Sequence, residues 1–130
     1  MRYLVSICLL LAALIHLLPV VGVISVDRVQ SLYGVALDGP DLQILMRHRA
    51  VLFGLLGLYL LAAAFIPALQ PSALGAGLVS VVSFLVLAWS TTGYNTSVAR
   101  IVAVDIVALV ALLIGTAAYF IIRSRSWPQT

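Results

Sequence analysis

One carboxylate inside an apolar segment is the residue of this chain best placed to do chemistry. Asp105 lies within the run 102–107, about one helical turn inside the last long apolar stretch. An ionised carboxylate costs about 2.5–3.5 kcal/mol at the centre of a bilayer and less toward the interface, so it normally faces the interior of a helix bundle and finds a partner there. We expect Asp105 to point inward with the residues that follow it on the same helical face, Ala108, Leu112, Thr116 and Tyr119.

Three consecutive residues at the start of another apolar stretch, Arg47, His48 and Arg49, are the candidate partners of Asp105. Both stretches are expected to enter the membrane from the same side. Arg49 lies about 200° round the helix from Arg47, so the two cannot point at one target. Arg47 shares its face with small residues that let helix backbones approach closely, Ala50, Gly54 and Gly57. We favour Arg47 as the partner, with Arg49 or His48 as the alternative.

The other interpretation is that all three of these residues are interfacial anchors whose long stems snorkel to lipid headgroups. Arg100 is nearer to Asp105 in sequence, but it projects about 140° away from it on an ideal helix and is a poor partner.

His16 is the other polar side chain expected at depth. It lies about ten positions from the end of the first apolar stretch, which places it near mid-bilayer, about 15 Å from the loop side. Two interpretations stay open: a neutral imidazole hydrogen-bonded to Ser83 or to a backbone carbonyl, or a member of a proton relay or ligand site. Asp105 should lie nearer the surface, so we expect no direct contact between the two.

Several classes of site are excluded by what the sequence lacks. Cys8 is the only cysteine and cannot make an internal disulfide, a redox pair or a zinc site. There is no glycine-rich phosphate loop, no HExxH or GxSxG motif and no histidine or cysteine cluster with metal-ligand spacing. The net charge of +3 is small and scattered, unlike a nucleic-acid surface. We expect no metal, no cofactor and no nucleic-acid partner, and we favour a protein that is not an enzyme.

The composition requires lipid around these residues. The 130 residues are 64% hydrophobic and 8% charged, with a mean hydropathy of +1.22, whereas soluble domains are about 45–50% apolar and about 25% charged. Only helices or closed barrels satisfy the backbone in hydrocarbon, and the alternation of barrel strands is missing. We predict one integral membrane domain, 1–130, that is an all-α, four-transmembrane-helix, up-down bundle. The four helices are expected at about 3–25, 40–69, 72–90 and 98–122.

The first stretch exceeds the apolar core of a signal peptide, about 7–15 residues, so we interpret it as a retained helix. A long first loop follows. Its segment 27–33 predicts a short amphipathic helix at the interface, with Val29, Leu32 and Tyr33 toward lipid. The turn at 38–41, with Pro40 and Asp41, marks the start of the second long helix.

Every basic residue is arginine and every acidic one is aspartate, which we interpret as the coding bias of a bacterial genome. We therefore expect the bacterial inner membrane. Arginines are almost balanced between the two faces, so the positive-inside rule decides little alone. If Arg47 or Arg49 is held inside the bundle, it does not count toward the positive-inside rule. That lowers the arginine count on the face opposite the termini, and on that basis we predict cytoplasmic termini.

Three short motifs carry a resemblance: 32–34 (LYG), 47–54 (RHRAVLFG), and Arg100 five residues before Asp105. With four short spans and a longer first loop, the chain resembles the DoxX-like group of small four-helix bacterial membrane proteins along nearly its whole length. The resemblance implies a membrane partner of oxidoreductases or a protein of uncharacterised role.

We predict a polar pocket near the face that carries the first and third loops. It would hold a lipid headgroup or small amphiphile, or dock a membrane-protein partner or a second copy of the chain. Arg47 and Arg49 would contact the anionic group, Asp105 would fix the arginine geometry, and Tyr33 and Trp89 would border the entrance. The alternatives are a proton- or solute-coupled transporter, oligomeric and using Asp105 and His16, and a membrane accessory of an oxidoreductase.

Overall fold

The computed structural model describes residues 2–125, which form five α-helices and two short 3-10 segments. In chain order these are α1 (Arg2–Leu17), η1 (Leu18–Val23), α2 (Val26–Tyr33), α3 (Pro40–Phe65), η2 (Pro67–Leu69), α4 (Gln70–Ser90) and α5 (Thr96–Arg125). Four segments are long and apolar enough to cross a membrane: Tyr3–Val23, Pro40–Phe65, Pro67–Ser90 and Thr96–Arg125. The all-α, four-span prediction is confirmed, and the chain is a multi-pass membrane protein.

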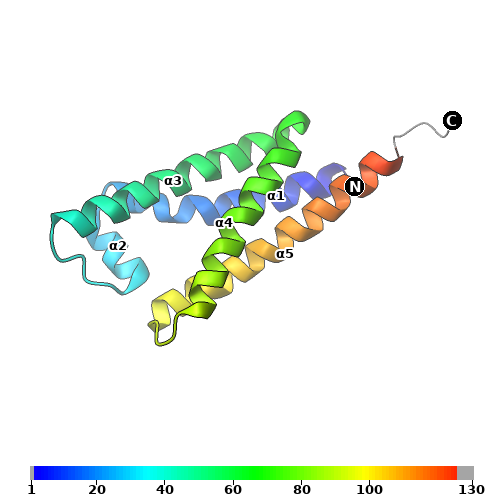
Figure 1. Cartoon of the computed structure of the whole chain (residues 1–130). Helices are drawn as coiled ribbons and strands as arrows, with labels where there is room; N and C mark the ends of the chain where they lie inside the picture. The colour runs from blue at the N-terminus through cyan, green and yellow to red at the C-terminus, as the bar shows by residue number, and fades with distance from the viewer. Residues whose placement is uncertain (1, 126–130) are drawn as a thin grey trace.

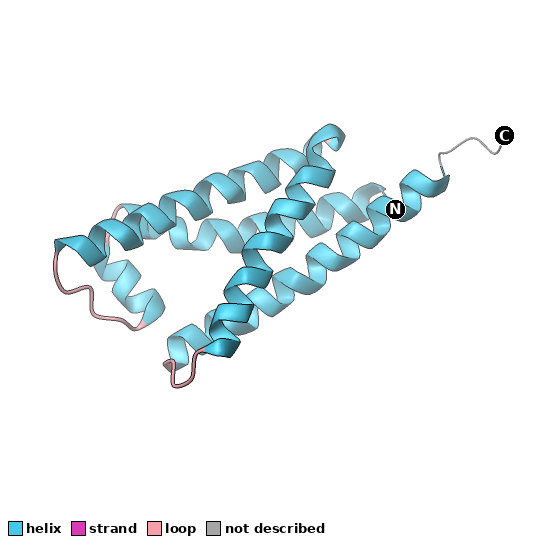
Figure 2. Cartoon of the chain, in the orientation of Figure 1, coloured by secondary structure: helices cyan, strands magenta, loops and turns pink. Residues whose placement is uncertain are grey.

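The four long helices run up, down, up and down (Figure 1). α1 packs against α3 and α5, and α4 packs against the same two helices from the other side, so α3 and α5 occupy a diagonal of the bundle. The beginning of α1 and the end of α5 lie at one end, and the α2–α3 and α4–α5 loops lie at the other (Figure 2). This second end is called the loop end below.

Two prolines set helix boundaries that differ from the predicted ones. Pro19 has no N–H and its ring displaces the carbonyl four residues earlier, so the α-helix ends at Leu17 and the chain continues as 3-10 to Val23. Pro67 holds Ile66 extended, so α3 ends at Phe65 rather than near 69. α5 is longer than predicted, Thr96–Arg125 against 98–122.

Small residues bring α1 close to α3. A side chain on Gly57 would meet Leu17 Cγ at 2.8 Å and the Ala13 carbonyl oxygen at 3.3 Å, and one on Gly54 would meet Val20 at 3.0 Å. The face of α3 that carries these glycines is therefore the face that packs on α1 and η1. Outward positions carry large apolar side chains suited to lipid, among them Leu55, Val79 and Phe120.

α2 covers the loop end of the bundle. Ser25 caps its start by accepting from the Arg28 N–H at 3.4 Å, and Gly34 ends it with a positive φ of 62°. Val29 and Tyr33 are buried with Leu37 in a small apolar cluster, against which Leu32 packs. The amphipathic helix is confirmed, but the prediction that its apolar face turns to lipid is wrong, because that face packs on the bundle.

Replacing Gly57 by alanine should loosen the α1–α3 contact and lower the free energy of unfolding by about 1–3 kcal/mol, the usual range for overpacking. Gly75→Ala, in the interior of α4, is the matched control, because no described atom lies within 4 Å of its added Cβ. The control should be neutral or raise stability by up to about 1 kcal/mol, since alanine favours helix. Denaturation in mild detergent, followed by helical circular dichroism, measures both; equal stability of the two variants would contradict the close approach.

Candidate functional site

Asp105 lies on the inner face of α5, with its side chain only 7% exposed. Ala108 and Leu112 follow it on this face and are fully buried, while Thr116 and Tyr119 are half-buried. The prediction that the carboxylate points into the bundle is confirmed.

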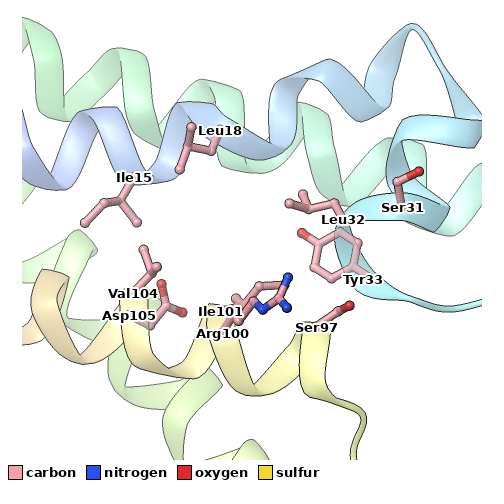
Figure 3. Close-up of a pocket in the computed structure, with 10 residues that line it drawn as sticks. All are labelled: Ile15, Leu18, Ser31, Leu32, Tyr33, Ser97, Arg100, Ile101, Val104 and Asp105. Atoms are coloured by element: carbon pink, nitrogen blue, oxygen red, sulfur yellow. The ribbon is translucent and has the colours of Figure 1, made fainter.

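The carboxylate faces a cavity of about 240 Å³ between α1, α2 and α5. Figure 3 shows side chains from all three helices arranged around this space, with Asp105 and Val104 reaching toward α1. The lining is mainly apolar, and its polar members are Ser31, Tyr33, Ser97, Arg100 and Asp105. We call this space the Asp105 cavity.

Within residues 2–125 the structure gives Asp105 neither a hydrogen bond nor an ion pair within 4.0 Å. The positive charge that acts on it is that of Arg49, across the diagonal of the bundle. Buried ionised groups are normally paired, because burial removes their hydration without replacing it. Asp105 points inward without a bonding partner among residues 2–125, so its carboxylate can accept a hydrogen bond from a molecule outside the chain.

Arg49 is held by aromatic rings instead of by a carboxylate. Its guanidinium carbon lies 4.8 Å from the centre of the Phe53 ring, 4.9 Å from that of Tyr33 and 6.0 Å from that of Phe84. Such cation–π contacts stabilise an arginine by about 2 kcal/mol or more when the group is desolvated. Arg49 lines a neighbouring cavity of about 350 Å³, and Tyr33 and Ile101 line both cavities and form the wall between them.

The preference for Arg47 as the partner of Asp105 is wrong. Arg47 is exposed, and its Nε donates to the Val23 carbonyl at 3.0 Å. It shares a face with the small residues of α3, but that face packs on α1 and η1, while α5 lies diagonally opposite. Arg49, about 200° round the helix, is the arginine that reaches the interior. His48 is exposed.

His16 occupies a structural position. Its Nδ1 lies 2.8 Å from the Ala12 carbonyl oxygen, and its ring stacks on Phe53 with centroids 5.6 Å apart and an interplanar angle of 21°. The carbonyl accepts, so Nδ1 carries the hydrogen. Ser83 donates to the Ser80 carbonyl in its own helix. Of the two interpretations, the contacts match the imidazole bonded to a backbone carbonyl, and the described lining of the Asp105 cavity does not include His16.

The two aromatic residues expected at the entrance differ in position. Tyr33 is buried and forms the wall described above. Trp89 is 64% exposed on the outer surface of α4, and among the described residues it belongs to the lining of neither cavity. An aromatic belt at the interface accounts for Trp89.

Sequence reasoning missed Asn95, which ties α2 to α5. Its side-chain oxygen accepts from the Val98 N–H at 2.9 Å and caps α5, and its Nδ2 donates to the carbonyls of Tyr33 at 2.9 Å and Gly34 at 3.0 Å. An asparagine just before a helix is a capping signal, but its second contact is not readable from spacing. Phe53 and Phe84 were missed as well, because phenylalanine in an apolar span looks the same whether it faces lipid or a cation.

Residues 2–125 contain no group of three or more histidine, cysteine or acidic side chains placed to hold a metal ion. Comparisons with protein-family models, curated proteins and solved structures find no match to this chain.

Tyr33 should make stability fall at alkaline pH. Burial raises the pKa of its hydroxyl above 10.0 and the charge of Asp105 adds to this effect, while Arg49 opposes it. A raised folded-state pKa gives stability that is complete below 10.0 and is lost as the pH rises through the folded-state value. Melting temperatures measured below and above pH 10.0 should therefore fall more steeply for the native chain than for Tyr33→Phe. Melting temperatures that fall equally with pH in the native chain and in Tyr33→Phe would contradict this prediction.

Arg49→Gln should lower the free energy of unfolding by about 1–3 kcal/mol, because it removes the cation–π contacts and leaves Asp105 without a compensating charge. Arg47→Gln is the matched control on the same helix; it loses one exposed hydrogen bond and should change stability much less. Chemical denaturation in detergent compares the two. Losses of equal size would show that the aromatic rings do not hold Arg49 in this way.

Proposed function

We propose that the chain is a non-enzymatic membrane module that binds a lipid or small amphiphile in the Asp105 cavity. The composition of the cavity supports this, because ligand sites are mostly apolar with a few convergent polar groups that fix orientation. The apolar members would contact the body of an amphiphile; they are Ile15, Leu18, Leu32, Ile101 and Val104.

The observation that carries the proposal is Asp105, a residue only 7% exposed, whose carboxylate faces a cavity and has no hydrogen bond or ion pair from residues 2–125. Packing alone gives no reason for an acid at this position, since the neighbouring inward residues of α5 are Val102 and Ala108. A ligand that donates to Asp105 would replace the hydration lost on burial.

Access from the bilayer supports a membrane-borne ligand. Leu18 and Val104 line the cavity and are also 55% and 38% exposed on the apolar outer surface. A molecule dissolved in the membrane would reach the cavity between α1 and α5 without passing through water.

The proposal also covers the family, the membrane and the orientation of the chain. We place the chain beside the DoxX-like group, in the bacterial inner membrane and with cytoplasmic termini. Because Arg49 lies inside the bundle, it does not count toward the positive-inside rule, and one fewer arginine favours the opposite orientation. Docking of a partner subunit or a second copy would use the same loop end.

Filling the cavity should remove the ligand. Val104→Phe places a ring at the lining, and we expect the amount of amphiphile retained on purification to fall at least threefold. Val107→Phe is the matched control, because Val107 lies one turn further along α5, is 52% exposed and is outside the described lining. Native mass spectrometry of both variants and the native chain gives the retained mass; equal retention would overturn the site.

A further inference from the structure

The Asp105 cavity has ends of opposite charge, and this polarity defines its ligand. We propose that the ligand carries a primary ammonium group beside an anionic group, as the headgroup of an aminophospholipid such as phosphatidylethanolamine does. The ammonium donates to Asp105 and the anion lies at Arg100 and Ser97. This inference rests on the proposed function and specifies the chemistry of its ligand.

The inner end requires a donor. A carboxylate only accepts hydrogen bonds, and no donor among the described residues reaches Asp105. Arg49, the cation whose charge acts on Asp105, is held over three rings and lines the neighbouring cavity instead of this one. A ligand ammonium would therefore be the first positive group in contact with Asp105.

The outer end favours an anion. Ser97 and Arg100 lie in the first turns of α5 and line the cavity, as Figure 3 shows along the start of that helix. Asn95 already accepts from the Val98 N–H, so α5 contributes the positive end of its dipole rather than that amide to an anion at this end. Arg100 is exposed and adds a guanidinium, which pairs with phosphate through two N–H donors.

The two ends are close enough for one headgroup. Arg100 and Asp105 are five residues apart on α5, a rise of about 7.5 Å, and the long arginine side chain can shorten or lengthen that span. A ligand with only a positive charge would meet the charge of Arg100 at the mouth. A ligand with only a negative charge would be repelled by Asp105. A neutral zwitterion, with its anion outermost, satisfies both.

Purified protein equilibrated with mixed micelles of phosphatidylethanolamine, phosphatidylcholine and phosphatidylglycerol tests the proposal by native mass spectrometry. We expect phosphatidylethanolamine to be retained about tenfold over the other two lipids, the effect of one hydrogen bond to a charged group. Asp105→Asn should remove this preference. Asp41→Asn makes the same charge change at an exposed position on the loop side and should preserve it.

Arg100→Gln keeps the test decisive if Asp105→Asn unfolds. Arg100 is exposed, so its replacement should leave the fold intact and lower retention of phosphatidylethanolamine and phosphatidylglycerol alike. Arg28→Gln, exposed and outside the described lining, should lower neither. Displacement of bound lipid by free glycerophosphoethanolamine would support the same chemistry in a water-soluble ligand.

Equal retention of the three lipids, or a preference for phosphatidylglycerol that Asp105→Asn leaves unchanged, would overturn the inference. Phosphatidylcholine binding as well as phosphatidylethanolamine would overturn it too, because a quaternary ammonium has no N–H to donate. In each case Val104→Phe would still lower total retention, so the cavity would remain the site. If the proposed function itself is wrong, Val104→Phe will leave the total amount of retained lipid unchanged.

Discussion

An acidic side chain inside an apolar bundle has to be compensated, and the loop end of this protein is arranged around that requirement. The chain supplies compensation at a distance: Arg49 acts on Asp105 across the diagonal between α3 and α5. Three rings keep the guanidinium in place without a carboxylate. Both charges are thus retained within the bundle, while on the side of its cavity the carboxylate has no bonding partner among residues 2–125.

α2 maintains the separation between the two charges. It contributes Tyr33, whose ring lies under Arg49 and whose side chain divides the two cavities. Its position depends on Val29 and Leu37, which are buried beside Tyr33, and on Asn95, which donates to the last carbonyls of the helix while capping α5. Movement of α2 would therefore alter the wall of both cavities together with the start of α5.

The spans were predictable because length and hydropathy alone decide which segments can cross a bilayer. The inward aspect of Asp105 followed from the helical face that it shares with Ala108 and Leu112. The choice of Arg47 failed because a stripe of small residues marks the nearest neighbouring helix, which is α1, and says nothing of a helix on the diagonal. The lipid-facing assignment of α2 failed for a related reason: an apolar face of Val29 and Tyr33 suits hydrocarbon and a protein interior equally well.

Because the interior of the bundle is apolar, the net charge of a ligand affects its binding there more than any single contact does. The charges of Arg49 and Asp105 are opposite, so a neutral zwitterion would add no net charge to the interior, and it would meet Asp105 with its ammonium and Arg100 with its anion. An anionic lipid would add a negative charge beside Asp105, and a simple cation would have to pass Arg100. Since opposite charges attract more strongly away from water, and like charges repel more strongly, the apolar walls of the cavity would strengthen the discrimination among ligands of different charge.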